Sequence, residues 1–146
     1  MATASSAHDV TEDSVLGGRL RLRQPRRGHR VGHDAILLAA ACPAHAGEDI
    51  IDLGAGVGAA GLAVAARVSG VAVTLVEIDP QLAALAQENV HLNGFAARMR
   101  AVALDAAAPA RAFAAAGMAA DVASRVLMNP PFNDPEIGRA SCRERV

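Results

Sequence analysis

The residues of this sequence that are best suited to bind a ligand or take part in catalysis follow short apolar runs. The first run ends at Asp52 and leads into a loop that contains Gly54, Gly56 and Gly58. Glycine permits positive φ angles and a close approach of the backbone to a ligand, and a helix that starts after the loop presents unpaired N–H groups. The loop predicts a site for a ligand with a sugar or an acidic group, although similar loops also bind dinucleotides or only allow tight strand-to-helix packing.

Three later apolar runs are each followed by a polar residue. These residues are Glu77, Asp105 and Asn129, the last of which begins the segment Asn129-Pro-Pro-Phe. Glu77 lies about 20 residues beyond the glycine loop, a spacing at which a carboxylate can accept hydrogen bonds from both hydroxyls of a ribose. A solvated strand end would also place an acid there. Together, the polar groups after all four apolar runs, at Asp52, Glu77, Asp105 and Asn129, predict a ligand site more specifically than any one of them does.

The elements that must position these residues alternate along the chain. Apolar, β-branched runs at 71–76, 99–104 and 124–128 predict strands after the one that ends at Asp52, and helical patterns lie between them. Asp79 and Pro80 are typical of a helix start, and Asn93-Gly94 is typical of its end. This alternation predicts an α/β fold with a doubly wound parallel sheet and functional groups at the carboxyl ends of its strands.

The N-terminal region has a different character. Residues 1–18 are small, polar and non-periodic, which predicts a flexible leader. The next residues alternate between apolar and basic side chains, as in a strand. They belong to a cluster of six arginines, Arg19, Arg21, Arg23, Arg26, Arg27 and Arg30. This cluster is either a solvated edge strand whose charges discourage aggregation or a contact for nucleic-acid phosphates.

The composition predicts one soluble globular domain. The chain has 146 residues, of which 52% are hydrophobic and 20% charged, and its net charge of −1 predicts no general affinity for nucleic acid or membrane. It contains no apolar run of about 20 residues and no signal-like start, so we expect a cytoplasmic protein. The two cysteines, Cys42 and Cys142, imply no disulfide and no metal framework.

The C-terminal segment 136–146 looks like a translated sequencing adapter, and we expect it to lie outside the native fold. On this interpretation residues 19–135 are the N-terminal part of the native domain, and the natural protein continues beyond Pro135. We then expect a sheet that is truncated after its fourth strand, and a fragment without enzymatic activity.

Three segments resemble the class I S-adenosylmethionine-dependent methyltransferases: Asp52-Leu-Gly-Ala-Gly-Val-Gly, Val76-Glu-Ile-Asp and Asn129-Pro-Pro-Phe. The resemblance implies a Rossmann-like sheet of about seven strands and S-adenosyl-L-methionine as the cofactor. It also implies a cofactor site in which Gly54, Ala55 and Gly56 line the methionine part, Glu77 holds the ribose, Ile78 packs on the adenine and Asp105 contacts the adenine amino group.

The resemblance identifies Asn129-Pro-Pro-Phe as the catalytic motif for methylating planar amino nitrogens. Such an amine is a poor nucleophile because its lone pair is delocalised. If the Asn129 side-chain oxygen and the Pro130 carbonyl accept its two N–H bonds, the lone pair is directed at the methyl group, and Phe132 can stack on the extruded base. Positioning then supplies much of the rate and no metal is needed. Alternatively, Pro-Pro after a strand is an ordinary stiff turn.

The segment 24–40 resembles bacterial tRNA adenine-N6 methyltransferases of the valine-tRNA type, which implies an RNA partner, most simply tRNA. The fourth motif residue, Phe132, departs from the Tyr that is more usual in that family. Phe is also found in rRNA guanine-N2 methyltransferases, and Asn-Pro-Pro-Tyr in enzymes that methylate glutamine in release factors. These substrates remain alternatives.

Two other classes of protein remain as alternatives to a methyltransferase. An NAD-dependent dehydrogenase would need a catalytic His or Tyr with a suitable partner, and the chain contains no Tyr. A non-catalytic RNA-binding module on a methyltransferase scaffold would use the arginine cluster and would retain RNA without transferring a methyl group.

Overall fold

A four-stranded parallel sheet forms the centre of the computed structural model, which describes residues 9–28 and 30–130. Its strands are β3 (Asp49–Leu53), β4 (Ala72–Glu77), β5 (Met99–Ala103) and β6 (Arg125–Met128). Their spatial order is β5-β4-β3-β6, so in chain order the parallel strands lie 3-2-1-4, as in the first four strands of a doubly wound sheet. The predicted α/β fold is confirmed.

The register of the sheet aligns the carboxyl ends of its strands. Leu53 at the end of β3 lies opposite Val76 of β4 and Met128 of β6. At the opposite end, Arg125 donates two hydrogen bonds of 2.8 Å to the carboxylate of Glu48, which directly precedes β3. This bidentate pair adds geometric specificity to the pairing of two strands that are distant in the sequence.

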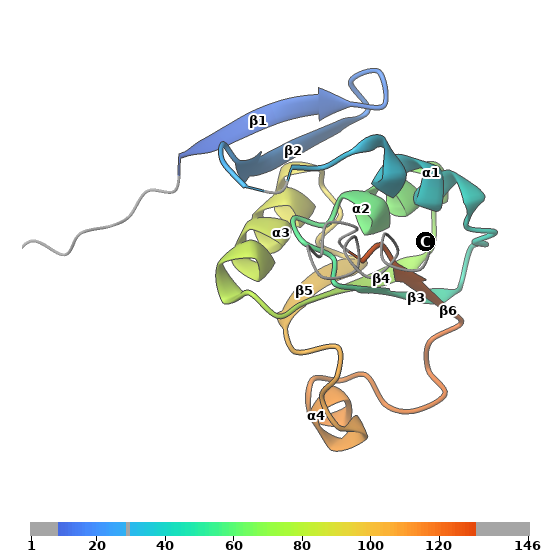
Figure 1. Cartoon of the computed structure of the whole chain (residues 1–146). Helices are drawn as coiled ribbons and strands as arrows, with labels where there is room; N and C mark the ends of the chain where they lie inside the picture. Colours follow the sequence, from blue (N-terminus) through green and yellow to red (C-terminus); the bar gives the residue numbers. More distant parts are fainter. Residues whose placement is uncertain (1–8, 29, 131–146) are drawn as a thin grey trace, which may run out of the picture.

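Helices alternate with the strands, as the sequence pattern predicts, and lie on both sides of the sheet (Figure 1). Three of them, α1 (His33–Ala41), α2 (Ala59–Arg67) and α3 (Pro80–Leu92), lie on one side, and the short α4 (Ala110–Ala115) lies on the other. The Asp79 carboxylate caps α3 by accepting hydrogen bonds from the N–H groups of Gln81 and Leu82, with Pro80 in the first turn, which confirms the predicted start of this helix.

The packing of α2 on the sheet depends on a glycine. A Cβ atom added at Gly61 would lie 2.5 Å from Cδ2 of Leu75 and 3.1 Å from Cγ1 of Val73. Only a residue without a side chain therefore allows the helix to approach β4 so closely. Leu62, Val64 and Leu75 are fully buried in this contact.

The prediction of a flexible leader over residues 1–18 is wrong for the part that the structure describes. Residues Val10–Val15 form β1, which pairs antiparallel with β2 (Leu20–Pro25). This hairpin lies over α2 and α3 (Figure 1), and Leu20 and Leu22 are completely buried against them. Residues 1–8, the predicted foreign tail 136–146 and the motif residue Phe132 lie outside the described residues.

Candidate functional site

The carboxyl ends of β3, β4 and β6 meet at one edge of the sheet. A small hollow of about 110 Å³ lies there. Asp52, Gly54, Ala55 and Gly56 line one part of it, and Asn129 lines another. The parallel register thus brings together the glycine loop and the start of the Asn-Pro-Pro-Phe motif, which are separated by more than 70 residues in the sequence.

The glycines of the loop have two different structural roles. All three have positive φ angles, of 68° at Gly54, 57° at Gly56 and 90° at Gly58. A Cβ atom added at Gly54 or Gly56 would meet no atom within 4 Å, so this backbone faces open space. One added at Gly58 would lie 2.7 Å from Cδ1 of Leu75. Gly54 and Gly56 therefore leave room for a ligand, whereas Gly58 allows α2 to start against the sheet.

Glu77, at the end of β4, is buried and bonded to the loop. Its Oε2 accepts a hydrogen bond of 2.7 Å from the N–H of Gly56, and its Oε1 accepts one of 3.0 Å from the N–H of Asp79. These contacts fix the orientation of the carboxylate. A carboxylate offers about four lone-pair positions, so two remain for other donors such as the hydroxyls of a ribose. The geometry of Glu77 therefore fits the predicted cofactor.

Asp52 contributes a buried carboxyl group to the hollow. Only 2% of its surface is exposed, and its Oδ2 accepts a hydrogen bond of 2.9 Å from the N–H of Gly61. Burial raises the pKa of Asp52, the hydrogen bond from the Gly61 N–H lowers it, and the negative charge of Glu77 raises it, so that the pKa lies at about 7. This carboxyl group therefore exchanges a proton close to neutral pH.

The remaining predicted site residues occupy different positions. Asn129 is half-buried and Pro130 exposed. Ile78 is 63% exposed after β4, and Asp105 is exposed after β5, where its Oδ1 accepts a hydrogen bond of 2.8 Å from Ala107. Among the predicted residues that the structure describes, those that do not line the hollow are Gly58, Glu77, Ile78, Asp105 and Pro130. Ile78 and Asp105 follow β4 and β5, on the side of the sheet away from Asn129.

The comparison with protein families decides the identity of the domain. Residues 29–144 match the model of the methyltransferase small domain family. The chain belongs to this family. The match includes the glycine loop, Glu77 and the Asn-Pro-Pro-Phe segment, and so it confirms the resemblance to methyltransferases drawn from these motifs.

Individual methyltransferases are similar to this chain over part of their length. The tRNA1(Val) (adenine(37)-N6)-methyltransferase of Cronobacter sakazakii is 39% identical over 72 residues, which are 49% of this chain and 29% of that protein. A predicted O-methyltransferase from Agrobacterium tumefaciens, Atu636, is 39% identical over 68% of this chain and 49% of its own, with a TM-score of 0.61. The chain thus spans less than half of either protein.

The same fold occurs in the structure of M. jannaschii TYW2 in complex with AdoMet. That comparison has a TM-score of 0.65 and 16% identity, and it covers 92% of this chain and 57% of TYW2. It supports the Rossmann-like architecture independently of close sequence similarity.

Several residues that line the hollow of this methyltransferase domain were not predicted. They are Val31, Gly32, Ala35, Val57, Ala59, Ala60 and Leu82. Val31 and Gly32 directly precede α1 within the segment 24–40, which resembles tRNA adenine-N6 methyltransferases, so that segment was the available signal. Leu82 lies in the first turn of α3, where an apolar residue is indistinguishable in the sequence from a core residue.

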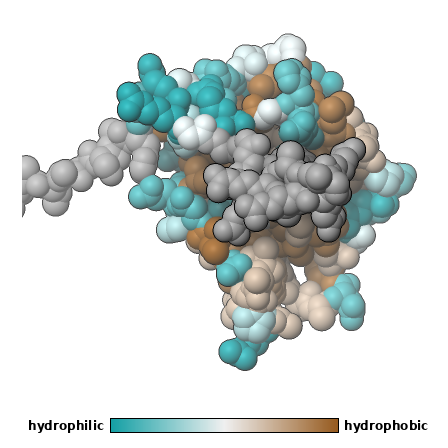
Figure 2. Space-filling view, viewed as in Figure 1, coloured by the Kyte–Doolittle hydropathy of each residue, from teal (hydrophilic) through white to brown (hydrophobic). Residues whose placement is uncertain are grey.

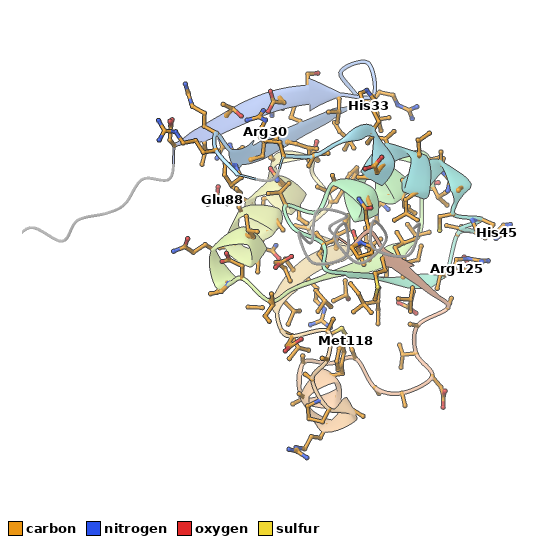
Figure 3. All side chains as sticks on the ribbon, in the orientation of Figure 1. Arg30, His33, His45, Glu88, Met118 and Arg125 are labelled. Carbon is orange, nitrogen blue, oxygen red and sulfur yellow. The ribbon has the colours of Figure 1, made fainter. Side chains whose placement is uncertain are left out.

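Four of the six arginines in the cluster form ion pairs with carboxylates. Its ion pairs are Arg21 and Arg23 with Glu12, Arg26 with Asp9, Arg30 with Asp13, and Arg23 also with Glu88, at 2.8 to 3.5 Å. Figure 2 shows hydrophilic residues gathered over the hairpin, and Figure 3 shows Arg30 beside it and Glu88 on α3. These pairs favour the interpretation as a solvated strand over a strong phosphate contact.

None of the helices in the described ranges has the length and apolar character needed to span a membrane.

Proposed function

We propose that this protein is an S-adenosylmethionine-dependent methyltransferase that acts on an exocyclic amino group of an RNA base, and that the base is adenine, methylated at N6, in a tRNA. The main support is that Asn129, the first residue of the Asn-Pro-Pro-Phe motif, lines the same hollow as Gly54, Ala55 and Gly56. A nitrogen bonded to Asn129 would then lie beside a methyl donor bound at the loop.

In the proposed site, each cofactor contact uses a group with suitable chemistry. The open backbone at Gly54, Ala55 and Gly56 would contact the methionine part, and the free lone pairs of Glu77 would accept from the ribose. The exposed side chain of Ile78 would pack on the adenine and Asp105 would accept from its amino group. When bound, S-adenosylmethionine supplies a methyl group on a sulfonium sulfur, an activated leaving group.

The proposed catalysis depends on positioning at the end of β6. The side-chain oxygen of Asn129 and the carbonyl of Pro130 would accept the two amino N–H bonds, and Phe132 would stack on the base. In the proposed transfer, the N–C bond would form as the C–S bond of the methyl donor breaks, the electron pair would stay on sulfur, and one amino proton would pass to solvent. The hydrogen-bond acceptors direct the nitrogen lone pair and stabilise the positive charge that develops on the amino group.

The choice of substrate is supported by sequence similarity. The relative from Cronobacter sakazakii is named as a tRNA adenine-N6 methyltransferase, and the segment 24–40 resembles that type of enzyme. A protein that modifies tRNA in a bacterium would work in the cytoplasm. Guanine N2 in rRNA and glutamine N5 in a protein are the alternative substrates, because their enzymes have related motifs.

The experiment that tests this proposal is a transfer assay with the intact protein, bulk tRNA, bulk rRNA and cofactor labelled in its methyl group. The RNA is then digested to nucleosides, and the Asn129→Ala variant serves as the control. N6-methyladenosine in tRNA supports the proposal. N2-methylguanosine or labelled glutamine would identify one of the alternative substrates, and retention of RNA without any transfer would indicate a non-catalytic binding module.

A further inference from the structure

Asn89, in α3, is a completely buried polar residue that contacts two other parts of the domain. Its Oδ1 accepts a hydrogen bond of 2.7 Å from the N–H of Arg23. Its Nδ2 donates one of 2.9 Å to the carbonyl of Arg23 and one of 3.0 Å to the carbonyl of Val57. Both N–H bonds of the amide are used, so its orientation is fixed by the hairpin on one side and the glycine loop on the other.

Val57 lies between Gly56 and Gly58, in the loop that lines the proposed cofactor site. Two side chains hold this part of the loop: Glu77 accepts from the N–H of Gly56, and Asn89 donates to the carbonyl of Val57. A glycine-rich backbone has more conformational freedom than others, so its shape depends on such contacts. Loss of the Asn89 amide would leave the buried carbonyl of Val57 without this donor.

Asn93, the C-cap residue that follows α3 one turn after Asn89, provides a matched comparison. It accepts a hydrogen bond of 2.9 Å from the N–H of Arg21 and donates one of 2.8 Å to the carbonyl of the same residue. The two asparagines thus hold alternate residues along the free edge of β2 in the same manner. The other bond from the Asn93 amide goes to the carbonyl of Asn89 within α3, and not to the glycine loop.

We propose that Asn89 is a positioning residue that links the arginine-bearing hairpin to the glycine loop, so that cofactor binding and the backbone of β2 are coupled. A ligand that stabilises the loop stabilises the hydrogen bond that Asn89 donates to the carbonyl of Val57, and with it the two hydrogen bonds between Asn89 and Arg23. By thermodynamic reciprocity, a molecule that binds the hairpin and shifts β2 changes the affinity for the cofactor. The inference rests on the proposed cofactor, S-adenosylmethionine, and is independent of which nitrogen is methylated.

The first test compares Asn89→Ala with Asn93→Ala in the intact protein. Calorimetric titration with S-adenosylmethionine should show an affinity about tenfold weaker for Asn89→Ala, as expected for one lost positioned hydrogen bond. Asn93→Ala should stay within about twofold of the wild type, although both variants melt at lower temperature. Equal affinities in the two variants would mean that Asn89 has only a structural role.

The second test needs no substitution. Hydrogen exchange of the wild-type protein, followed residue by residue by NMR, compares the N–H groups of Arg23 and Arg21, which are bonded to Asn89 and Asn93 respectively. Saturation with S-adenosylmethionine should slow exchange at Arg23 several-fold more than at Arg21. An equal response, or none at either residue, contradicts the coupling. Absence of any binding to the wild type would instead overturn the proposed cofactor, and the inference with it.

Discussion

The buried carboxylate of Asp52 in β3 and the backbone N–H of Gly61 in α2 are joined by a hydrogen bond of 2.9 Å. Because burial raises the pKa of Asp52 to about 7, the folded protein binds more protons than the unfolded chain between about pH 4 and 7. This group's contribution to stability is therefore lost as pH rises through that window. Asp52→Asn should become progressively more stable relative to the wild type from pH 5 to pH 8, measured by urea denaturation. Parallel pH profiles for the two proteins would contradict the assignment.

Asn129→Ala should lower kcat by about 10² or more, which is the scale of losing one positioned polar group in a transition state. The affinity for S-adenosylmethionine should change little, because the cofactor contacts proposed above come from other residues. Single-turnover kinetics and calorimetric titration on the same preparation separate the two effects. Normal turnover by this variant would show that the catalytic role of Asn129 is wrong.

Glu77→Ala should have the opposite signature, with cofactor affinity reduced by about tenfold or more. The substitution removes the proposed ribose acceptor and also the acceptor for the N–H of Gly56. Glu77→Gln is the matched variant, because it keeps one acceptor oxygen but loses the charge, and it should bind with intermediate affinity. Calorimetric titration gives all three affinities. If Glu77→Ala bound the cofactor as tightly as the wild type, the ribose assignment would fail.

Gly61→Ala should destabilise the fold by about 1 kcal/mol or more, although alanine has the better helix propensity by about 1 kcal/mol. The reason is that an added Cβ would lie 2.5 Å from Cδ2 of the fully buried Leu75, and overpacking of this kind costs roughly 1–3 kcal/mol. In a Leu75→Val background, Gly61→Ala should lower the free energy of unfolding by less, because valine lacks the Cδ2 atom that the added Cβ would contact. Chemical denaturation of the two single variants and the double variant measures the coupling, and strictly additive costs would rule out this contact as the cause.

The sheet was predictable because parallel buried strands are marked by continuous apolar runs. Val71–Val76 in the sequence corresponds to β4 with a shift of one residue, and the run at 99–104 corresponds to β5. The hairpin was predicted only in part, because β1 contains Thr11, Glu12 and Asp13 and has no apolar face of its own. β1 forms because it pairs with β2, and Glu12 lies opposite Arg23 in that pairing. This pairing depends on the tertiary fold and cannot be predicted from the β1 residues alone.

For the candidate site, residue types at the strand ends predicted the groups that meet at the hollow, because parallel register brings such ends together. Asp52, Gly54 and Asn129 are examples. Sequence could not distinguish Gly56, whose backbone faces open space, from Gly58, which packs against Leu75, because both are glycines of the same loop with positive φ angles. Asn89 was not predicted as a site residue, because nothing in the sequence of a helix indicates that one of its asparagines will bond to a residue 66 positions away.

The bidentate pair between Glu48 and Arg125 also has a consequence for the order of assembly. It joins the start of β3 to the start of β6, which pair side by side although β4 and β5 are synthesised between them. Contacts of such long sequence separation slow folding, and at about 5–20 residues per second a ribosome needs several seconds to make the intervening chain. The glycine loop and Glu77 are complete in the nascent chain well before Asn129 is added. The half of the site proposed to bind the cofactor can therefore form during translation, before the half proposed to bind the substrate has been synthesised.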